Sequence, residues 1–118
     1  GGASTLAAMT DVSMDITNFV DSILIQTDSD GSAPSTGTLS SATGNVGIGR
    51  NVFSAITTDT YNIAIGYNAM AASEGGNNNI GIGKNALDAC TSGASNIAIG
   101  KDAGIQPMVL KMGQIALL

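Results

Sequence analysis

A five-residue motif recurs four times in this chain at a constant spacing of 17 residues. Each copy starts with Asn, continues as a β-branched residue, Gly or Ala and Ile, and ends with Gly. The copies are Asn45-Val46-Gly47-Ile48-Gly49, Asn62-Ile63-Ala64-Ile65-Gly66, Asn79-Ile80-Gly81-Ile82-Gly83 and Asn96-Ile97-Ala98-Ile99-Gly100. Chance does not plausibly produce four such matches at one spacing, so the fold must be built from stacked copies of one unit.

The 17-residue unit is too short for a pair of helices, which needs ~33 residues. Its alternation of β-branched and small residues has the period of a strand. The closing Gly permits a bend that other residues resist. A second short apolar stretch, such as Asn68-Ala69-Met70, and a small polar stretch follow. The sequence therefore predicts an all-β fold, a β-solenoid of four rungs, each consisting of strand, bend, short strand and turn and stacked ~4.8 Å apart.

Stacking in register would align equivalent residues of the four units in columns. The Asn column has two interpretations: a ladder of side-chain amides bonded from rung to rung, or turn residues that bond their own backbone. We favour the ladder, and neither interpretation makes the Asn residues a ligand site. The predicted structural ladders are Asn45, Asn62, Asn79 and Asn96, and Ile48, Ile65, Ile82 and Ile99, with Val46, Ile63, Ile80 and Ile97 as a second aliphatic column.

A column of small residues alternates with the aliphatic columns and must point the opposite way. A solvent-facing strand surface more often carries Thr or charged residues, so something should pack closely against this small face. Either the chain's own second strand or another subunit around a symmetry axis can do so. Aromatic residues make up only 3 % of the chain, so a single chain has few bulky side chains with which to fill its interior. We therefore favour a homo-oligomer and assign subunit packing to the small face. Its members are Gly47, Ala64, Gly81 and Ala98.

Charge divides the chain into parts. Residues 1–44 contain five Asp and no Lys or Arg, whereas the remainder is balanced. We expect an acidic N-terminal cap or attachment segment with a Gly/Ser/Thr/Pro loop over 1–44, the repeats over 45–104, and an apolar cap or attachment tail over 105–118. Within the first part, residues 22–26 are predicted to form a strand. Since the chain begins with Gly rather than Met, we expect a processed product or a segment of a longer protein.

The composition argues against an enzyme. The chain has no His and one Cys, which excludes a Ser-His-Asp triad, a Cys-His pair and a zinc knuckle. Asp28 and Asp30 before Gly31 match half of a calcium loop, but the other ligands are missing, so a polar turn is favoured. We therefore expect no metal and no cofactor. The net charge of -5 argues against nucleic acid, and no apolar run approaches the ~18 residues of a membrane helix.

One polar column follows the closing Gly of each motif, and it is the candidate glycan-facing stripe of the chain. Its long side chains have two interpretations, a stripe for an anionic cell-surface glycan or a soluble, unpaired strand edge, and we favour the edge. The column consists of Arg50, Tyr67, Lys84 and Lys101. Cys90 has no base nearby in the sequence and is expected to be a small buried or half-buried filler.

The motif Asn-Ile-Ala-Ile-Gly-Xaa-Asn-Ala, seen in residues 62–69, is similar to repeats in tail-fibre and related adhesive proteins of tailed bacteriophages, marine phages in particular. It resembles more loosely the head repeats of trimeric autotransporter adhesins, whose unit is usually shorter. The segment from Asn18 to Gly44 also looks like the lead-in to such phage repeats. The resemblance covers roughly residues 11–104. It implies a homotrimer of left-handed β-rolls with the small face near the three-fold axis.

The resemblance also implies a function. A rigid trimeric stalk or adhesive segment of a phage tail fibre or other virion appendage would support attachment to a host receptor. Its partners would be other virion or fibre proteins at the termini and a host-surface glycan, and its location would be the virion. The alternative is a self-contained carbohydrate-binding or adhesin-type solenoid. An ice-binding version is disfavoured because Thr57, Thr60 and Thr91 do not share one column.

Overall fold

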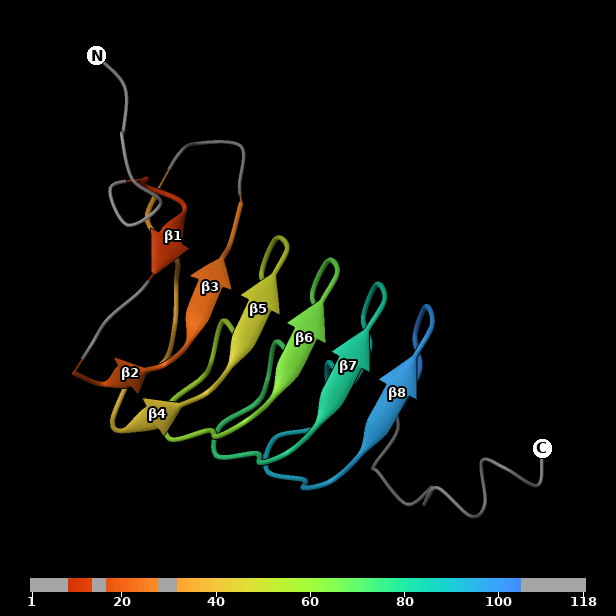
Figure 1. The fold of residues 1–118 in the computed structure, drawn as a ribbon. Helices are drawn as coiled ribbons and strands as arrows, with labels where there is room; N and C mark the ends of the chain where they lie inside the picture. The colour runs from red at the N-terminus through yellow and green to blue at the C-terminus, as the bar shows by residue number, and fades with distance from the viewer. Residues whose placement is uncertain (1–8, 14–16, 28–31, 105–118) are drawn as a thin grey trace.

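A computed structural model describes residues 9–13, 17–27 and 32–104, which form short strands and turns and contain no helix (Figure 1). Six strands make one mixed sheet in the order β1-β3-β5-β6-β7-β8, and β2 and β4 make a second, parallel pair. The all-β prediction is thereby confirmed. The strands are β1 (Val12–Ser13), β2 (Phe19–Val20), β3 (Ile23–Ile25), β4 (Ala42–Thr43), β5 (Val46–Ile48), β6 (Ile63–Ile65), β7 (Ile80–Ile82) and β8 (Ile97–Ile99).

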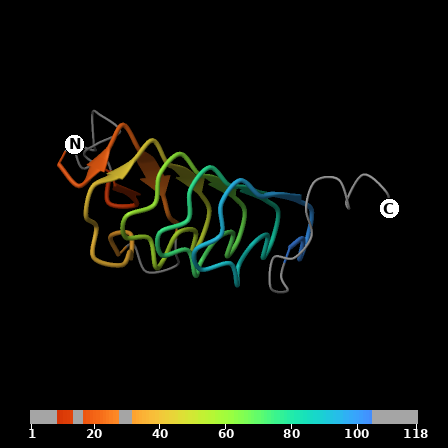
Figure 2. The same ribbon diagram turned by 90° about the horizontal axis from the view of Figure 1, so that it is seen from below.

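The 17-residue period becomes parallel pairing in register. Strands β5 to β8 each pair with the equivalent strand of the next unit, so that Ala64 lies opposite Gly81 and Gly81 opposite Ala98. A second line of parallel bridges connects Thr60 with Asn77 of the next unit. Figure 2 shows the successive loops of chain side by side. Equivalent positions of neighbouring units therefore face each other at more than one place along the unit.

The N-terminal part contributes strands to the same sheet. Strand β3 lies within the predicted strand at residues 22–26 and pairs in parallel with β5, with Ile23 opposite Val46. Strand β1 runs antiparallel to β3 and covers its free edge, with Val12 opposite Ile25. The sheet thus continues across the predicted boundary between residues 44 and 45. The expectations for residues 105–118 and for the Asp28–Gly31 turn lie outside the described residues.

The second half of each unit is a series of turns, and the predicted short strand at residues 68–70 is wrong. Asn68 has a φ of 64° and Met70 a φ of 50°, both in the left-handed region. An extended segment needs negative φ throughout, so two left-handed residues in three fold the chain back toward its own strand. The same pair of conformations recurs at Asn51 and Phe53 one unit earlier.

The small face lies inside the chain's own fold. Ala64 is 0 % exposed, and it belongs to one buried cluster with Phe53 and Met70 from the turn segments. A Cβ atom on Gly47 would lie 2.6 Å from the Phe53 ring, so the ring would have to shift to admit one. The assignment of this face to subunit packing is therefore wrong, because the turns fold bulky side chains over it. The correction applies to Gly47, Ala64, Gly81 and Ala98, all buried in the single chain.

Candidate functional site

The aliphatic columns form the outer surface of the sheet. Because side chains alternate across a strand, the inward position of Ala64 turns its neighbours Ile63 and Ile65 outward. Ile48 is 41 % exposed and Ile99 is 67 % exposed. Parallel pairing aligns these side chains in rows ~4.8 Å apart, and we call this surface the isoleucine face. It comprises Val46, Ile48, Ile63, Ile65, Ile80, Ile82, Ile97 and Ile99, together with Ile23 and Ile25 of β3.

A buried ladder of amides lies beside the isoleucine face, at the start of each strand. Asn62 Nδ2 donates to Asn45 Oδ1 at 3.1 Å and to the carbonyl oxygen of Gly76 at 2.8 Å. Its own Oδ1 accepts from the backbone N–H of Asn79 at 2.8 Å and from Asn79 Nδ2 at 3.2 Å. Of the two interpretations of the Asn column, the geometry is that of the ladder. The ladder ties each unit to the next and holds the strands in register.

The ladder includes both ends of the repeated region. Asn96 donates to Asn79 Oδ1 from its backbone N–H and from Nδ2, at 2.9 and 3.1 Å. At the first unit, Asn45 Nδ2 donates to the carbonyl oxygen of Asp59 at 2.8 Å. The four Asn side chains predicted to form one column are therefore brought together.

Asp59 is a buried carboxylate that the sequence analysis did not identify. It is 0 % exposed and accepts from the backbone N–H groups of Gly75 and Gly76 of the next unit, at 2.8 and 3.1 Å. The Ser73 hydroxyl also donates to it. The only sequence signal is an acidic residue in a column that otherwise contains Gly76 and Gly93. Its role in the structure is to join two units.

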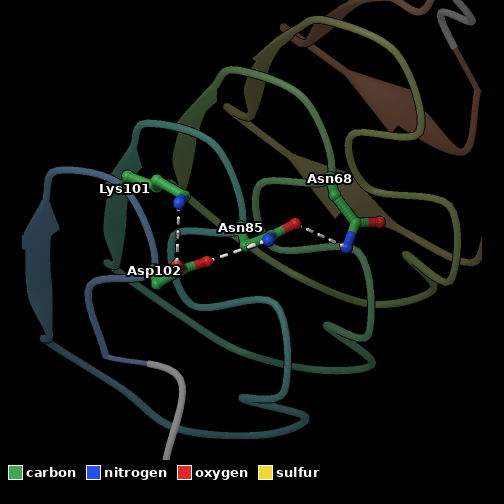
Figure 3. A network of polar contacts seen from close by, with 4 residues as sticks. All are labelled: Asn68, Asn85, Lys101 and Asp102. Atoms are coloured by element: carbon green, nitrogen blue, oxygen red, sulfur yellow. Dashed lines mark hydrogen bonds and ion pairs between the residues drawn. The ribbon is translucent and has the colours of Figure 1, made fainter.

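A second polar ladder lies on the outside of the turns (Figure 3). Asn68 Nδ2 donates to Asn85 Oδ1 at 3.1 Å, and Asn85 Nδ2 donates to Asp102 Oδ1 at 2.9 Å. Asn51 begins the ladder by donating to Asn68 Oδ1. Asn and Asp tolerate the left-handed conformation better than other side chains that carry a Cβ, which explains their recurrence at this position. These residues therefore combine a backbone requirement with side-chain bonding.

We expect Asn68→Ala to destabilise the protein by roughly 1–2 kcal/mol, because it loses ladder bonds and places a Cβ without a compensating amide at a φ of 64°. Asn68→Gly keeps the backbone freedom and loses only the bonds. Thermal melts at one protein concentration should rank wild type above Asn68→Gly, and Asn68→Gly above Asn68→Ala. A reversed order of the two variants would contradict the conformational role.

The predicted stripe Arg50, Tyr67, Lys84 and Lys101 is exposed along its whole length. Lys84 Nζ lies 5.9 Å from the centre of the Tyr67 ring, within the range of a cation–π contact. Lys101 Nζ lies 3.9 Å from Asp102 Oδ2. The four residues are thus aligned beside the outer Asn ladder on one surface.

The described part of the chain holds no group of three or more His, Cys, Asp or Glu placed to bind a metal ion. Cys90 is buried there with a free thiol, as expected for a small filler. The same residues include no helix long and apolar enough to cross a membrane. The distinctive surfaces in this part are the isoleucine face and the polar stripe.

No family model matches the chain, and comparisons with curated proteins and with solved structures gave no match.

Proposed function

We propose that this chain is a structural module: a β-solenoid that assembles as a homotrimer through its isoleucine face. In this role it forms a rigid stalk or adhesive segment of a phage tail fibre or similar virion appendage and supports attachment to a host receptor. The resemblance of its repeats to those of tail-fibre proteins supports this assignment. The chain's other surfaces then serve to connect or present neighbouring parts.

The observation that carries the proposal is the exposure of the isoleucine face. Soluble monomers rarely expose a contiguous apolar patch larger than a few hundred Å², and this one is a regular grid of β-branched side chains. Burying an Ile side chain contributes about 1.5–3 kcal/mol. Ile65 is 37 % exposed on the single chain. Burying that exposed part in an interface would therefore contribute a share of this free energy. Copies of the same face meeting at a symmetry axis would remove all these side chains from water.

Rigidity follows from the bonds between units. The Asn45–Asn62–Asn79–Asn96 ladder and the Asp59 contacts link successive units at fixed register. Such a stack resists bending because each step is held by backbone and side-chain hydrogen bonds together. A stiff spacer with an apolar seam is suited to a multi-chain stalk.

Neighbouring residues with opposite orientations give a direct test. Ile65→Asp places a charge on the isoleucine face, and we expect it to reduce the native mass to that of a monomer while the β spectrum is retained. Ala64→Leu adds volume where the side chain is 0 % exposed, and should lower the melting temperature by overpacking the interior. Light scattering and circular dichroism distinguish these outcomes. If Ile65→Asp kept the wild-type mass, assembly through this face would be excluded.

A further inference from the structure

Every Lys and Arg among the described residues lies in one row on the outside of the turns. Arg50, Lys84 and Lys101 occupy the same position of three units, and Tyr67 occupies it in the remaining one. We call these four residues the basic row. The chain as a whole carries nine acidic residues and a net charge of -5, so this row is a local departure from its general charge.

The backbone that carries the basic row is not an unpaired strand edge. The backbone at this position is already bonded from unit to unit: the N–H of Asn68 donates to the carbonyl oxygen of Arg50 at 2.9 Å, and the N–H of Asn85 donates to that of Tyr67 at 2.9 Å. Edge protection by long charged side chains applies where backbone groups are free to pair with another chain. The carbonyl oxygen of Lys84 likewise accepts from the N–H of Asp102 at 2.8 Å. The edge interpretation favoured from sequence therefore does not account for Arg50 and Lys84.

The alignment also has an energetic cost. Lys84 and Lys101 are in equivalent positions of adjacent units, whose backbones are ~4.8 Å apart. Like charges placed directly opposite one another are destabilising. Asp102 offsets part of this cost near Lys101, whereas Lys84 lies against the ring of Tyr67. A row of cations kept in register on an acidic chain suits a ligand that carries negative charges.

We propose that the basic row binds an acidic polysaccharide that runs along the stack of units. Arg50 and Lys84 bracket Tyr67 and lie two units apart, which is about 10 Å. Carboxylates on alternate sugars would meet the two cations, while the pyranose between them packs on the exposed Tyr67 ring. Lys84, held near that ring, would then contact sugar and carboxylate together. The proposal goes beyond the structural role and concerns each single chain, so it does not depend on the number of subunits.

The spacing favours a sparsely charged polymer over nucleic acid. A nucleic-acid strand carries a phosphate about every 3.4 Å, whereas the row has three cations over a span of about 14 Å with an uncharged gap at Tyr67. The net charge of -5 repels a dense polyanion more strongly than one charged on every second sugar. Base stacking on Tyr67 alone would not offset that repulsion.

The test uses the full chain and a hyaluronan decasaccharide, which carries a carboxylate on alternate sugars and no sulfate. We expect calorimetric titration at low salt to show binding that weakens as the salt concentration rises. A neutral chitin oligosaccharide of the same length should not bind. Absence of hyaluronan binding at millimolar ligand, or tighter binding of a DNA duplex than of hyaluronan, would overturn the proposal.

Variants locate the contact. Lys84→Gln and Tyr67→Asn should each weaken binding roughly tenfold, the change expected when a charge-assisted bond or a stacking contact is lost. Tyr61→Asn removes the chain's other tyrosine, which lies outside the row, and is the control. It should bind like wild type, with all three variants first shown to keep the β spectrum. Equal losses in the variants and the control would overturn the assignment to the row.

Discussion

Replacing Gly66 with Ala is expected to destabilise the fold by roughly 3–5 kcal/mol, from backbone strain and overpacking together. Gly66 has a φ of 123°, which residues with a Cβ rarely adopt. A Cβ there would also lie 2.8 Å from the backbone carbonyl carbon and oxygen of Gly83 in the next unit. Since the obstacle is backbone, only separation of the two units would relieve it. Thermal and denaturant unfolding at one protein concentration measure the loss.

Gly75→Ala is the matched control for this substitution. Gly75 has a φ of 109°, but a Cβ there would meet only Thr58 Oγ1, at 3.5 Å. Gly75→Ala therefore introduces conformational strain without a clash between units. We expect it to lower the free energy of unfolding by about 1–2 kcal/mol. Similar losses in the two variants would mean that close stacking of the Gly backbones does not contribute.

Asp59→Ala should also cost roughly 3–5 kcal/mol, because it leaves several buried or partly buried donors without their acceptor. The carboxylate accepts from the N–H groups of Gly75 and Gly76 of the following unit and from the N–H of Thr57 at 3.0 Å. No other side chain in the next two units offers a carboxylate at this position, since the column continues as Gly76 and Gly93. Denaturant unfolding followed by circular dichroism measures the effect.

The control for Asp59→Ala is Glu74→Ala, which removes the same charge from an exposed position. A substitution at such an exposed position is expected to change the free energy of unfolding by no more than about 0.5 kcal/mol. If the two variants lost similar stability, net charge rather than the buried hydrogen bonds would explain the result, and the structural role of Asp59 would be wrong.

The repeat alone predicted much of the fold. The invariant spacing from Asn45 to Asn96 determines the parallel register, and the buried amide ladder follows from it. The N-terminal strand was predicted from the apolar run at Ile23–Ile25, but its pairing with Val46 was not, because a longer connection obscures the repeat there. The 17-residue spacing identifies equivalent residues within the repeats. It does not extend to the strand Ile23–Ile25, so the sequence did not show which residues this strand faces.

The orientation of the strands could not be predicted from alternation, because a period of two defines two faces without saying which is inside. Met70 and Leu87 determine which face is buried. Both adopt positive φ and place bulky side chains over the Gly/Ala face of the strands. Large apolar residues seldom take that conformation, so neither their identity nor their position in the unit indicated it. The same unexpected turns explain why the second strand of each unit was predicted and is not formed.

The native mass of the full chain, measured by light scattering after size exclusion over a range of concentrations, tests the central claim most directly. The account predicts a β-rich particle of three times 11.7 kDa, because burial of the isoleucine face stabilises the assembly. A folded monomer that remains soluble at high concentration with the isoleucine face exposed would contradict it.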